Sequence, residues 1–410
     1  MSSSYPLLAR QPIFDSNMDV FAYELLYRSN LLNQAHVIDN GDSASTQVLL
    51  STFADLSIDK VVGKKLAFIN FTTALLDSHI PFDTTQLVIE VLETEAVSAS
   101  LLHRLKVLRE QGFTIALDDF ELNENTEALI AYADIIKLDV LALSHDTLIE
   151  HINYLKPLGV QLLAEKIETF SMLEQCKRWG FDYFQGYFLE RPQVIRGKRL
   201  SENKQAVIQL LGLLNDGDAS FEEIERIIAH DPILSFKLLR MVNSAAFGLP
   251  RTIESLRQAI TLLGLKIIKN WVGLLAMANL GDKPQELSVK ALARAKFCEQ
   301  IAASSRPLHQ CDQFFTAGLL STLDAFMDMP LAELLADIHL SDALRAALLQ
   351  GSGEEGKILQ AAIAYEHGAW ESIDWVFLQQ QGIDEPNKLT DLYLQTLQWA
   401  DDTRSVMHAL

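Results

Sequence analysis

Two adjacent carboxylates, Asp118 and Asp119, follow an apolar run in the stretch FTIALDDFELNEN, residues 113–125. Polar residues also stand within or just after the other β-rich runs of the first half: Glu24, Asn70, Glu90, Lys137, Asp139, Glu165 and Gln185. Taken singly, an acid in such a run is typical of a solvated strand edge. As a buried set, carboxylates repel one another and lose water unless a cation neutralises them. Because hard oxygen ligands suit Mg²⁺ or Mn²⁺, we predict that Asp118 and Asp119 are ligands of a metal pair.

These runs alternate with helix-like segments up to about residue 192, and the alternation favours parallel strands joined by crossover helices. Strands are predicted at residues 20–28, 65–71, 87–93, 113–120, 134–140, 160–168 and 183–190. Helices are predicted at residues 43–56, 96–112 and 169–180, where apolar residues recur at helical spacing. The carboxyl ends of the strands in a parallel barrel converge on one face, so the polar residues are expected to meet there.

The order of these residues makes the segment from about residue 7 to 192 resemble the EAL domain, the barrel family of cyclic di-GMP phosphodiesterases. YELLYR, residues 23–28, is similar to the signature of that family with Leu25 in place of its usual Ala, and FINF, IEVLE, LDDF, IKLD, AEKIE and QGYFLERP are similar to its later motifs. The resemblance implies a TIM-like (β/α) barrel at residues 1–192 that opens cyclic di-GMP to linear pGpG with Mg²⁺ or Mn²⁺. Two metal ions in such a site lower the pKa of the attacking water and neutralise charge on the phosphate.

The same resemblance assigns roles to individual residues. The implied metal ligands are Glu24, Asn70, Glu90, Asp118, Asp119 and Glu165. The implied catalytic residues are Lys137, Asp119 and Glu24, and the implied substrate contacts are Arg28, Gln185 and Asp139. Glu93 and Glu168 are implied to support the neighbouring loop. The set of ligands that the resemblance calls for is therefore present in the sequence.

Two positions depart from the pattern of the family. The loop after the acid pair is ELNEN, residues 121–125, where a Gly-Thr-Gly stretch is usual, and Lys166 stands where Gly is usual. Because Gly reaches backbone angles that other residues reach less easily, this loop is expected to take a different shape. Beside the enzyme, two alternatives therefore stay open: a receptor that binds cyclic di-GMP without turnover, and a scaffold that binds only protein. Arg28 and Gln185 argue against the scaffold, which has no evident use for a phosphate-binding Arg beside an acid cluster.

The second half of the chain is predicted to be helical. A polar and basic linker is expected at residues 193–205, followed by a helical domain at residues 206–410. Residues 231–272 resemble the signature of HDOD, the HD-related output domain. The fold expected for the whole chain is thus an α/β barrel followed by an all-α domain.

Catalysis by this helical half is not expected. Ser321 and Thr322 stand where HD enzymes carry a His-Asp metal pair, and neither hydroxyl replaces those ligands. His230 beside Asp231 resembles a metal doublet, but an Asp before Pro232 is more typical of a helix start. We therefore predict an output domain that binds an unknown protein partner.

The composition favours a cytoplasmic protein of about two domains. A formal net charge of −20 over 410 residues argues against nucleic acid as a partner, because Lys and Arg neutralise phosphates in such complexes. Three scattered cysteines without CxxC spacing predict neither a disulfide framework nor a zinc site. No secretory signal or membrane span is predicted. The EAL resemblance also implies a homodimer, since the loop after the acid pair helps to form dimers in active members.

Overall fold

The structure is a computed structural model, and its described residues fall into two compact units. The described residues are 7–28, 58–77, 80, 83–190, 202–215, 228, 238–239, 242–243, 253, 255–278, 283–336, 338 and 340–408. The first unit comprises Met1–Leu189 with Glu366–Glu371, and the second comprises Glu190–Tyr365 with Ser372–Leu410. The predicted linker 193–205 lies outside the described residues up to residue 201, and α8 (Glu202–Asn215) begins within it.

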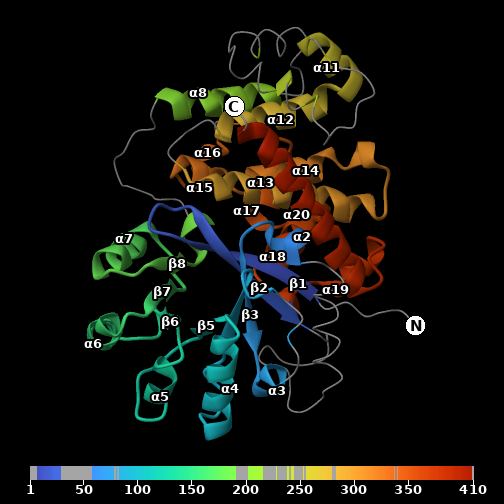
Figure 1. The fold of residues 1–410 in the computed structure, drawn as a ribbon. Helices are drawn as coiled ribbons and strands as arrows, with labels where there is room; N and C mark the ends of the chain where they lie inside the picture. The colour runs from blue at the N-terminus through green and yellow to red at the C-terminus, as the bar shows by residue number, and fades with distance from the viewer. Residues whose placement is uncertain are drawn as a thin grey trace. The chain divides into compact units, whose positions relative to one another are not determined.

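The first unit is a closed barrel in which the strands lie in chain order (Figure 1). The strands are β1 Leu7–Phe14, β2 Val20–Arg28, β3 Leu66–Phe71, β4 Leu87–Val91, β5 Thr114–Leu117, β6 Ile135–Asp139, β7 Gln161–Glu165 and β8 Tyr183–Gln185. Neighbouring strands from β2 to β8 pair in parallel, whereas β1 pairs antiparallel with both β2 and β8. The predicted α/β barrel is confirmed.

Strand β1 is the one strand of the described barrel that the sequence patterns did not predict. Its sequence LLARQPIF carries Pro12, which lies opposite Tyr23 of β2. Proline lacks the N–H that a strand ladder uses, so a run that contains it does not read as a strand. Leu8, Ala9, Ile13 and Phe14 are nevertheless fully buried, and β1 closes the barrel through Ile13 and Phe14 against β8. Burial and closure therefore outweigh the missing donor at Pro12.

An apolar layer fills the barrel below its mouth. This layer consists of Ile13, Ala22, Phe68, Val88, Ala116, Ile135 and Leu163, all buried. Side chains that point to one face of a strand recur every second residue. The residues two positions further along six of these strands are Glu24, Asn70, Glu90, Asp118, Lys137 and Glu165. The strand period that builds the core thus also places the polar residues one step above it.

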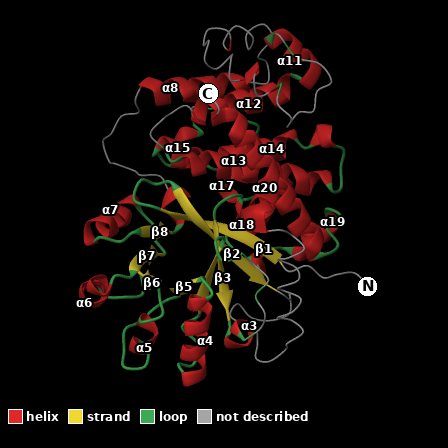
Figure 2. Cartoon of the chain, viewed as in Figure 1, coloured by secondary structure: helices red, strands yellow, loops and turns green. Residues whose placement is uncertain are grey.

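Short helices join the parallel strands and lie outside them in Figure 2. They are α2 Ile58–Val62, α3 Thr73–Leu76, α4 Ala99–Glu110, α5 Glu127–Ile130, α6 His145–Leu155 and α7 Phe170–Trp179, with the 3₁₀ turns η1 Lys156–Leu158 and η2 Tyr187–Glu190. Ser98 and Thr169 cap α4 and α7, because each side chain accepts a backbone N–H of the first turn. Gly180 ends α7 with a φ of 88°, a left-handed angle that favours glycine. The helix predicted at residues 43–56 lies outside the described residues.

The second unit is helical in all of its described elements. These are α8, α11 Leu256–Leu263, α12 Leu265–Ala278, α13 Gln285–Ala303, η3 Leu308–Gln310, α14 Asp312–Leu320, α15 Leu323–Met327, α16 Leu331–Leu334, α17 Asp342–Gln350, α18 Gly353–Glu366, α19 Trp375–Gln380 and α20 Pro386–His408. The 3₁₀ turn η4 Trp370–Ser372 begins in the first unit and ends in the second. Helix α13 packs against α14 and α20. The rings of Phe297, Tyr365 and Tyr393 meet in its core with centroid separations of 5.0 to 5.3 Å. The predicted all-α second half is confirmed.

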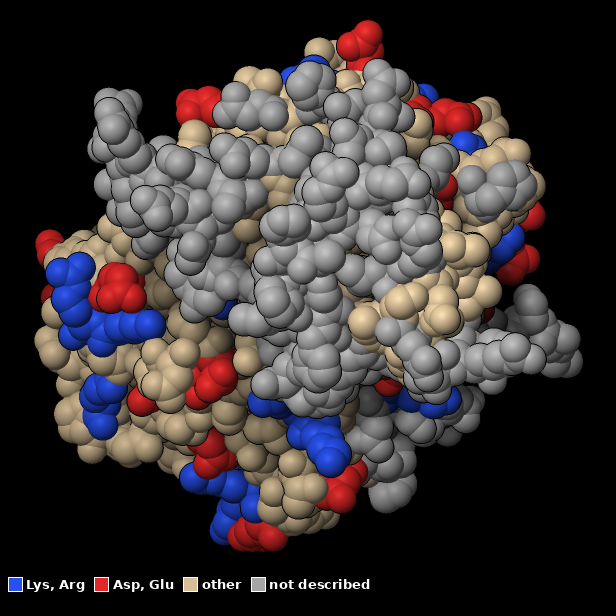
Figure 3. Space-filling view, turned by 90° about the horizontal axis from the view of Figure 1, so that it is seen from above, with Lys and Arg blue, Asp and Glu red and all other residues tan. Residues whose placement is uncertain are grey.

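Charged side chains of both signs are interspersed on the face shown in Figure 3, among the residues that are coloured there. Within the HDOD-like signature, residues 231–237, 240–241, 244–252 and 254 lie outside the described residues, and so does His230. In the parts of the chain that are described, no helix combines the length and the apolar character that a membrane crossing requires.

Candidate functional site

Lys137 is the centre of the polar residues at the barrel mouth. Its Nζ lies 2.6 Å from Glu90 Oε1, 2.6 Å from Asp118 Oδ1, 2.9 Å from Glu165 Oε1 and 3.4 Å from Glu24 Oε2. We call these five residues the inner cluster. Lys137 and Glu90 are fully buried, and the cluster draws on β2, β4, β5, β6 and β7. One ammonium therefore faces four carboxylates in a site with little water.

The surroundings raise the pKa values of Glu90, Glu165 and Lys137. Burial raises the pKa of Glu90 well above its usual range, and the ammonium of Lys137 only partly opposes this effect. Burial likewise raises the pKa of Glu165 to about 8. For Lys137, burial lowers the pKa, but Asp118 and the other three carboxylates outweigh it and leave the pKa well above the ordinary value. Lys137 therefore carries its proton at neutral pH in this arrangement.

Several buried oxygens at the mouth have no hydrogen-bond donor among the described residues. They are Asn70 Oδ1, Glu90 Oε2, Glu165 Oε2 and Gln185 Oε1. Buried oxygens left in this way are rare in folded proteins because each loses its bonds to water. Oxygens of carboxylates and side-chain amides are the donors that Mg²⁺ and Mn²⁺ prefer, so this set fits a divalent cation. No ready-made group of three or more acidic, His or Cys metal ligands exists in the described residues, since the inner carboxylates converge on Lys137 instead.

Gln185 and Asn70 orient Glu24 within this site. Gln185 Nε2 donates to Glu24 Oε2 at 2.6 Å, and Asn70 Nδ2 lies 3.5 Å from Glu24 Oε1. These contacts turn both amide groups so that their donors face Glu24 and their oxygens stay unbonded. Tyr27 adds a further link from β2 to β3, because its hydroxyl donates to the backbone oxygen of Asn70 at 2.8 Å. Tyr27 was not among the predicted site residues.

The two adjacent aspartates point to different partners. Asp118 joins Lys137, whereas both oxygens of Asp119 lie 3.2 Å from Lys166 Nζ, which also contacts Asp139 Oδ2 at 2.6 Å. We call Lys166, Asp119 and Asp139 the outer cluster. Asp119 and Lys166 have φ angles of 41° and 56°, in the left-handed region that non-glycine residues seldom adopt. Each follows a residue of the inner cluster, and the backbone turn sends its side chain to a separate ion pair.

The loop at residues 121–126 is held by its own hydrogen bonds. Asn123 Oδ1 accepts the backbone N–H groups of Asn125 at 2.9 Å and Thr126 at 3.2 Å. Thr126 Oγ1 donates to the backbone oxygen of Glu121 at 2.6 Å, and Leu122 N donates to His151 Nε2 at 2.9 Å. A side chain that bonds the backbone two or three residues on forms a compact turn without glycine. The loop is therefore a defined structure in which Asn and Thr make the turn.

The contacts of three predicted site residues, Arg28, Glu93 and Glu168, are not part of the inner or outer cluster as described above. Arg28 ends β2 opposite Leu7, and its side chain lies outside the described part of the chain. Glu93 and Glu168 both have interaction partners within the structure. A bond that the sequence did not suggest runs from Thr73 N to Glu95 Oε2 at 3.0 Å and ties the start of α3 to the loop after β4. The position of Glu95 shortly after a strand end was the available signal.

In the second unit, Ser321 and Thr322 stand where the sequence resemblance places the HD metal pair, and both hydroxyl groups are hydrogen-bonded to nearby backbone oxygens. Ser321 Oγ donates to the backbone oxygen of Gly318 at 2.7 Å, and Thr322 Oγ1 donates to that of Leu319 at 2.9 Å. Such bonds to the preceding turn satisfy hydroxyl groups locally. Arg294, which is buried, reaches Ser321 Oγ at 3.4 Å and Glu190 Oε2 at 2.8 Å. Ser321 and Thr322 thus complete the helix ends rather than offering ligands.

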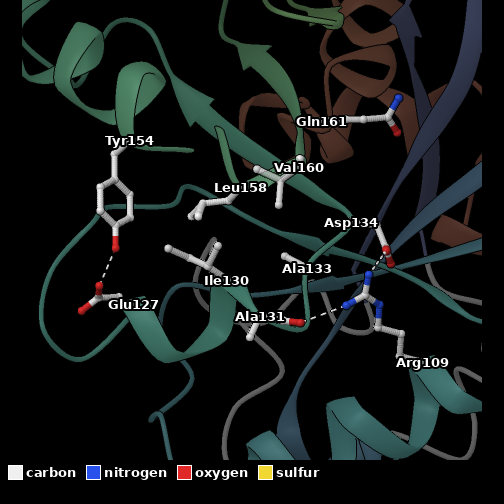
Figure 4. Close-up of a pocket in the computed structure, with 11 residues that line it drawn as sticks. Arg109, Glu127, Ile130, Ala131, Ala133, Asp134, Tyr154, Leu158, Val160 and Gln161 are labelled. Carbon is white, nitrogen blue, oxygen red and sulfur yellow. Dashed lines mark hydrogen bonds and ion pairs between the residues drawn. The ribbon is translucent and has the colours of Figure 1, made fainter. Parts of the chain in front are cut away.

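A cavity of about 610 Å³ opens at the other end of the barrel, near the amino ends of β6 and β7 (Figure 4). Arg109 Nη2 donates to Asp134 Oδ1 at 2.8 Å on its wall, and Tyr154 donates to Glu127. Arg109, Asp134 and Glu127, the charged side chains in view, thus already have partners. This end of such barrels is associated with stability rather than catalysis, so the mouth with its unbonded oxygens is the candidate site.

Comparison with known proteins agrees with this division. The EAL domain family matches residues 32–192, and the HDOD domain family matches residues 200–350. The chain is 29% identical over 400 residues to the cyclic di-GMP phosphodiesterase CdgJ of Vibrio cholerae, covering 96% of this chain and 92% of that protein. Among solved structures, a manganese and cyclic di-GMP complex of BlrP1 from Klebsiella pneumoniae is 22% identical, covers 46% of this chain and 56% of that chain, and has a TM-score of 0.38.

The likeness extends over the full arrangement of both domains. The chain is 33% identical over 407 residues to the uncharacterized protein YuxH of Bacillus subtilis, covering 96% of this chain and 97% of that protein. A match of this length includes the barrel, the connecting segment and the helical unit together. On these grounds the chain belongs to the family of proteins in which an EAL domain is followed by an HDOD domain.

Proposed function

We propose that the barrel is a metal-dependent phosphodiesterase that opens cyclic di-GMP to the linear dinucleotide pGpG. The observation that carries this proposal is the imbalance of the inner cluster, where one ammonium faces four carboxylates and buried oxygens lack donors. A site of this kind stores negative charge for a cation. The family of the chain and its similarity to CdgJ support a cyclic dinucleotide as the substrate.

The roles of the side chains follow from their positions. Glu24, Asn70, Glu90, Asp118 and Glu165 would hold Mg²⁺ or Mn²⁺, with Asp119 as a further ligand in the family pattern. A bound divalent cation supplies a water of lowered pKa and neutralises charge on the phosphate. Lys137, which keeps its proton, serves as a hydrogen-bond donor to the attacking water or a phosphate oxygen and not as a base. Gln185, Asp139 and Arg28 are the proposed contacts to the nucleotide.

A second candidate is a receptor that binds cyclic di-GMP without turnover. The outer cluster favours it, because Lys166 already occupies Asp119 and Asp139. The turn at residues 121–126 adds to this, since its own bonds set a shape without glycine. In either case we propose that the helical unit binds a protein partner and that the chain acts in the cytosol, where its three free, buried cysteines stay reduced.

Incubation of the purified chain with cyclic di-GMP and Mn²⁺ or Mg²⁺, followed by separation of the nucleotides, tests the proposal. The enzyme yields pGpG, and Glu90→Gln yields none because the buried carboxylate is lost. Glu110→Gln, at an exposed position on α4, is the matched control and should keep full turnover. Binding of cyclic di-GMP in calorimetry without any pGpG would establish the receptor in place of the enzyme.

A further inference from the structure

Lys166 is a second cation at the mouth, with a half-exposed side chain, and it belongs to the outer cluster. Its Nζ contacts both oxygens of Asp119 and one oxygen of Asp139. The remaining oxygen of Asp139 accepts the backbone N–H groups of Leu141 at 2.7 Å and Ala142 at 3.0 Å. Every carboxylate oxygen of the outer cluster therefore has a donor.

The inner cluster differs in its charge balance. The outer cluster has one ammonium for two carboxylates, whereas the inner cluster has one ammonium for four. The unbonded carboxylate oxygens Glu90 Oε2 and Glu165 Oε2 belong to the inner cluster. An added cation consequently gains more at the inner cluster, where buried carboxyl oxygens lack donors and the surroundings are drier.

The backbone indicates that the lysine side chain itself is used. Lys166 has a φ of 56°, an angle that glycine adopts freely and that costs a side-chain-bearing residue about 1 kcal/mol or more. Asp119, its partner, is strained in the same way with a φ of 41°. Strain at both ends of one ion pair is maintained only if the pair contributes something that glycine lacks. That contribution is the ammonium group of Lys166, which holds a positive charge against the carboxylates of Asp119 and Asp139.

We propose that Lys166 takes the place of a second divalent cation at Asp119 and Asp139, so that the barrel binds one such ion, at the inner cluster. This inference rests on the proposed function as a metal-dependent site. A metal ion at Asp119 would have to displace three charge-assisted contacts of the ammonium and would be repelled by that ammonium if it stayed nearby. The pair of metal ions expected from the sequence thus becomes one metal ion and one lysine.

The number of Mn²⁺ ions bound per chain tests this proposal without reference to turnover. Calorimetric titration, together with electron paramagnetic resonance of the free ion, should give one ion for the unaltered chain. Lys166→Gly suits the backbone angle, and Lys166→Met removes the charge while retaining the bulk; both should bind two ions. Lys106→Met removes an exposed lysine of α4 and should still bind one.

The outcomes separate this inference from the function on which it rests. Two ions in the unaltered chain, or one ion in both folded Lys166 variants, would overturn the role of Lys166 and leave the metal-dependent enzyme standing. No ion in any form of the chain would overturn both. Thermal unfolding checks that each variant is folded, and should neither variant fold, the count in the unaltered chain alone decides.

Discussion

The barrel mouth and the Ser321–Thr322 turn of the helical unit are the two places that the family resemblances in the sequence associate with metal ions, and they differ in how their polar groups are bonded. At the mouth, buried oxygens remain without donors and four carboxylates share one ammonium. At the turn, each hydroxyl is satisfied by its own helix. Buried oxygens that lack hydrogen-bond donors therefore indicate a ligand site, whereas hydroxyl groups that bond to their own helix indicate a structural role.

The sharpest test of this contrast substitutes residues in both places. Glu165→Gln should lower turnover of cyclic di-GMP by about 100-fold or more, since it removes a carboxylate ligand from the proposed metal site. Ser321→Ala and Thr322→Val should leave turnover within about twofold, because both hydroxyl groups donate to backbone oxygens of their own helix end. Initial rates of pGpG formation measure both effects. A large loss of turnover in the Ser321 or Thr322 variant would break the contrast.

Removing the ammonium of Lys137 tests how strongly the carboxylates of the mouth repel one another. Lys137→Met leaves four carboxylates without an ammonium and should lower the free energy of unfolding by about 3 kcal/mol in the absence of metal. Mn²⁺ should raise the melting temperature of this variant more than that of the unaltered chain. Urea denaturation and thermal scans provide these values. Unchanged stability in Lys137→Met would mean that the carboxylates neutralise themselves by taking up protons.

Gly186 in the barrel and Gly318 in the helical unit both lie against backbone atoms, so they allow the two regions to be compared by the same substitution. A methyl group on Gly186 would lie 2.1 Å from the backbone oxygen of Ile167, and one on Gly318 would lie 2.6 Å from Ala295 Cα. Gly186→Ala and Gly318→Ala should each lower the free energy of unfolding by about 2 kcal/mol through overpacking. Only Gly186→Ala should also reduce turnover, because it displaces the neighbouring Gln185. Equal turnover losses in both variants would contradict this expectation.

The smallest effect concerns Asp324 in the helical unit. Burial raises its pKa to about 6, while Arg294 opposes the shift and Glu190 adds to it. An acid with a raised folded pKa destabilises the fold once it ionises, so stability should fall as the pH rises from about 4 to about 6. Asp324→Asn keeps the acceptor for Ala325 N and should add about 1 kcal/mol at pH 8 and nothing at pH 4. Urea denaturation at both pH values tests this, and an equal gain at pH 4 would rule out ionisation as the cause.

Much of the barrel could be predicted from local patterns. The apolar-to-polar step from Ala22 to Glu24 and from Val88 to Glu90 follows the strand period of two, and that period is visible in the sequence. The carboxyl ends of the parallel strands meet at one face of the barrel, as the alternation of strands and helices in the sequence predicted. Strand β1 was not predicted because Pro12 interrupts its strand pattern. Its antiparallel pairing with β2 and β8 depends on closure of the barrel.

The partners of the charged groups were decided only by the tertiary structure. Adjacent in sequence, Asp118 and Asp119 diverge because the left-handed turn at Asp119 directs its carboxylate to Lys166, 47 residues away. Lys137 meets four carboxylates because β2, β4, β5 and β7 carry them to the mouth. The sequence by itself determined which residues reach the mouth, since strand periodicity is local. Which carboxylate meets which ammonium depends on backbone angles that hydrophobic patterns do not encode and on distances that only the closed barrel sets.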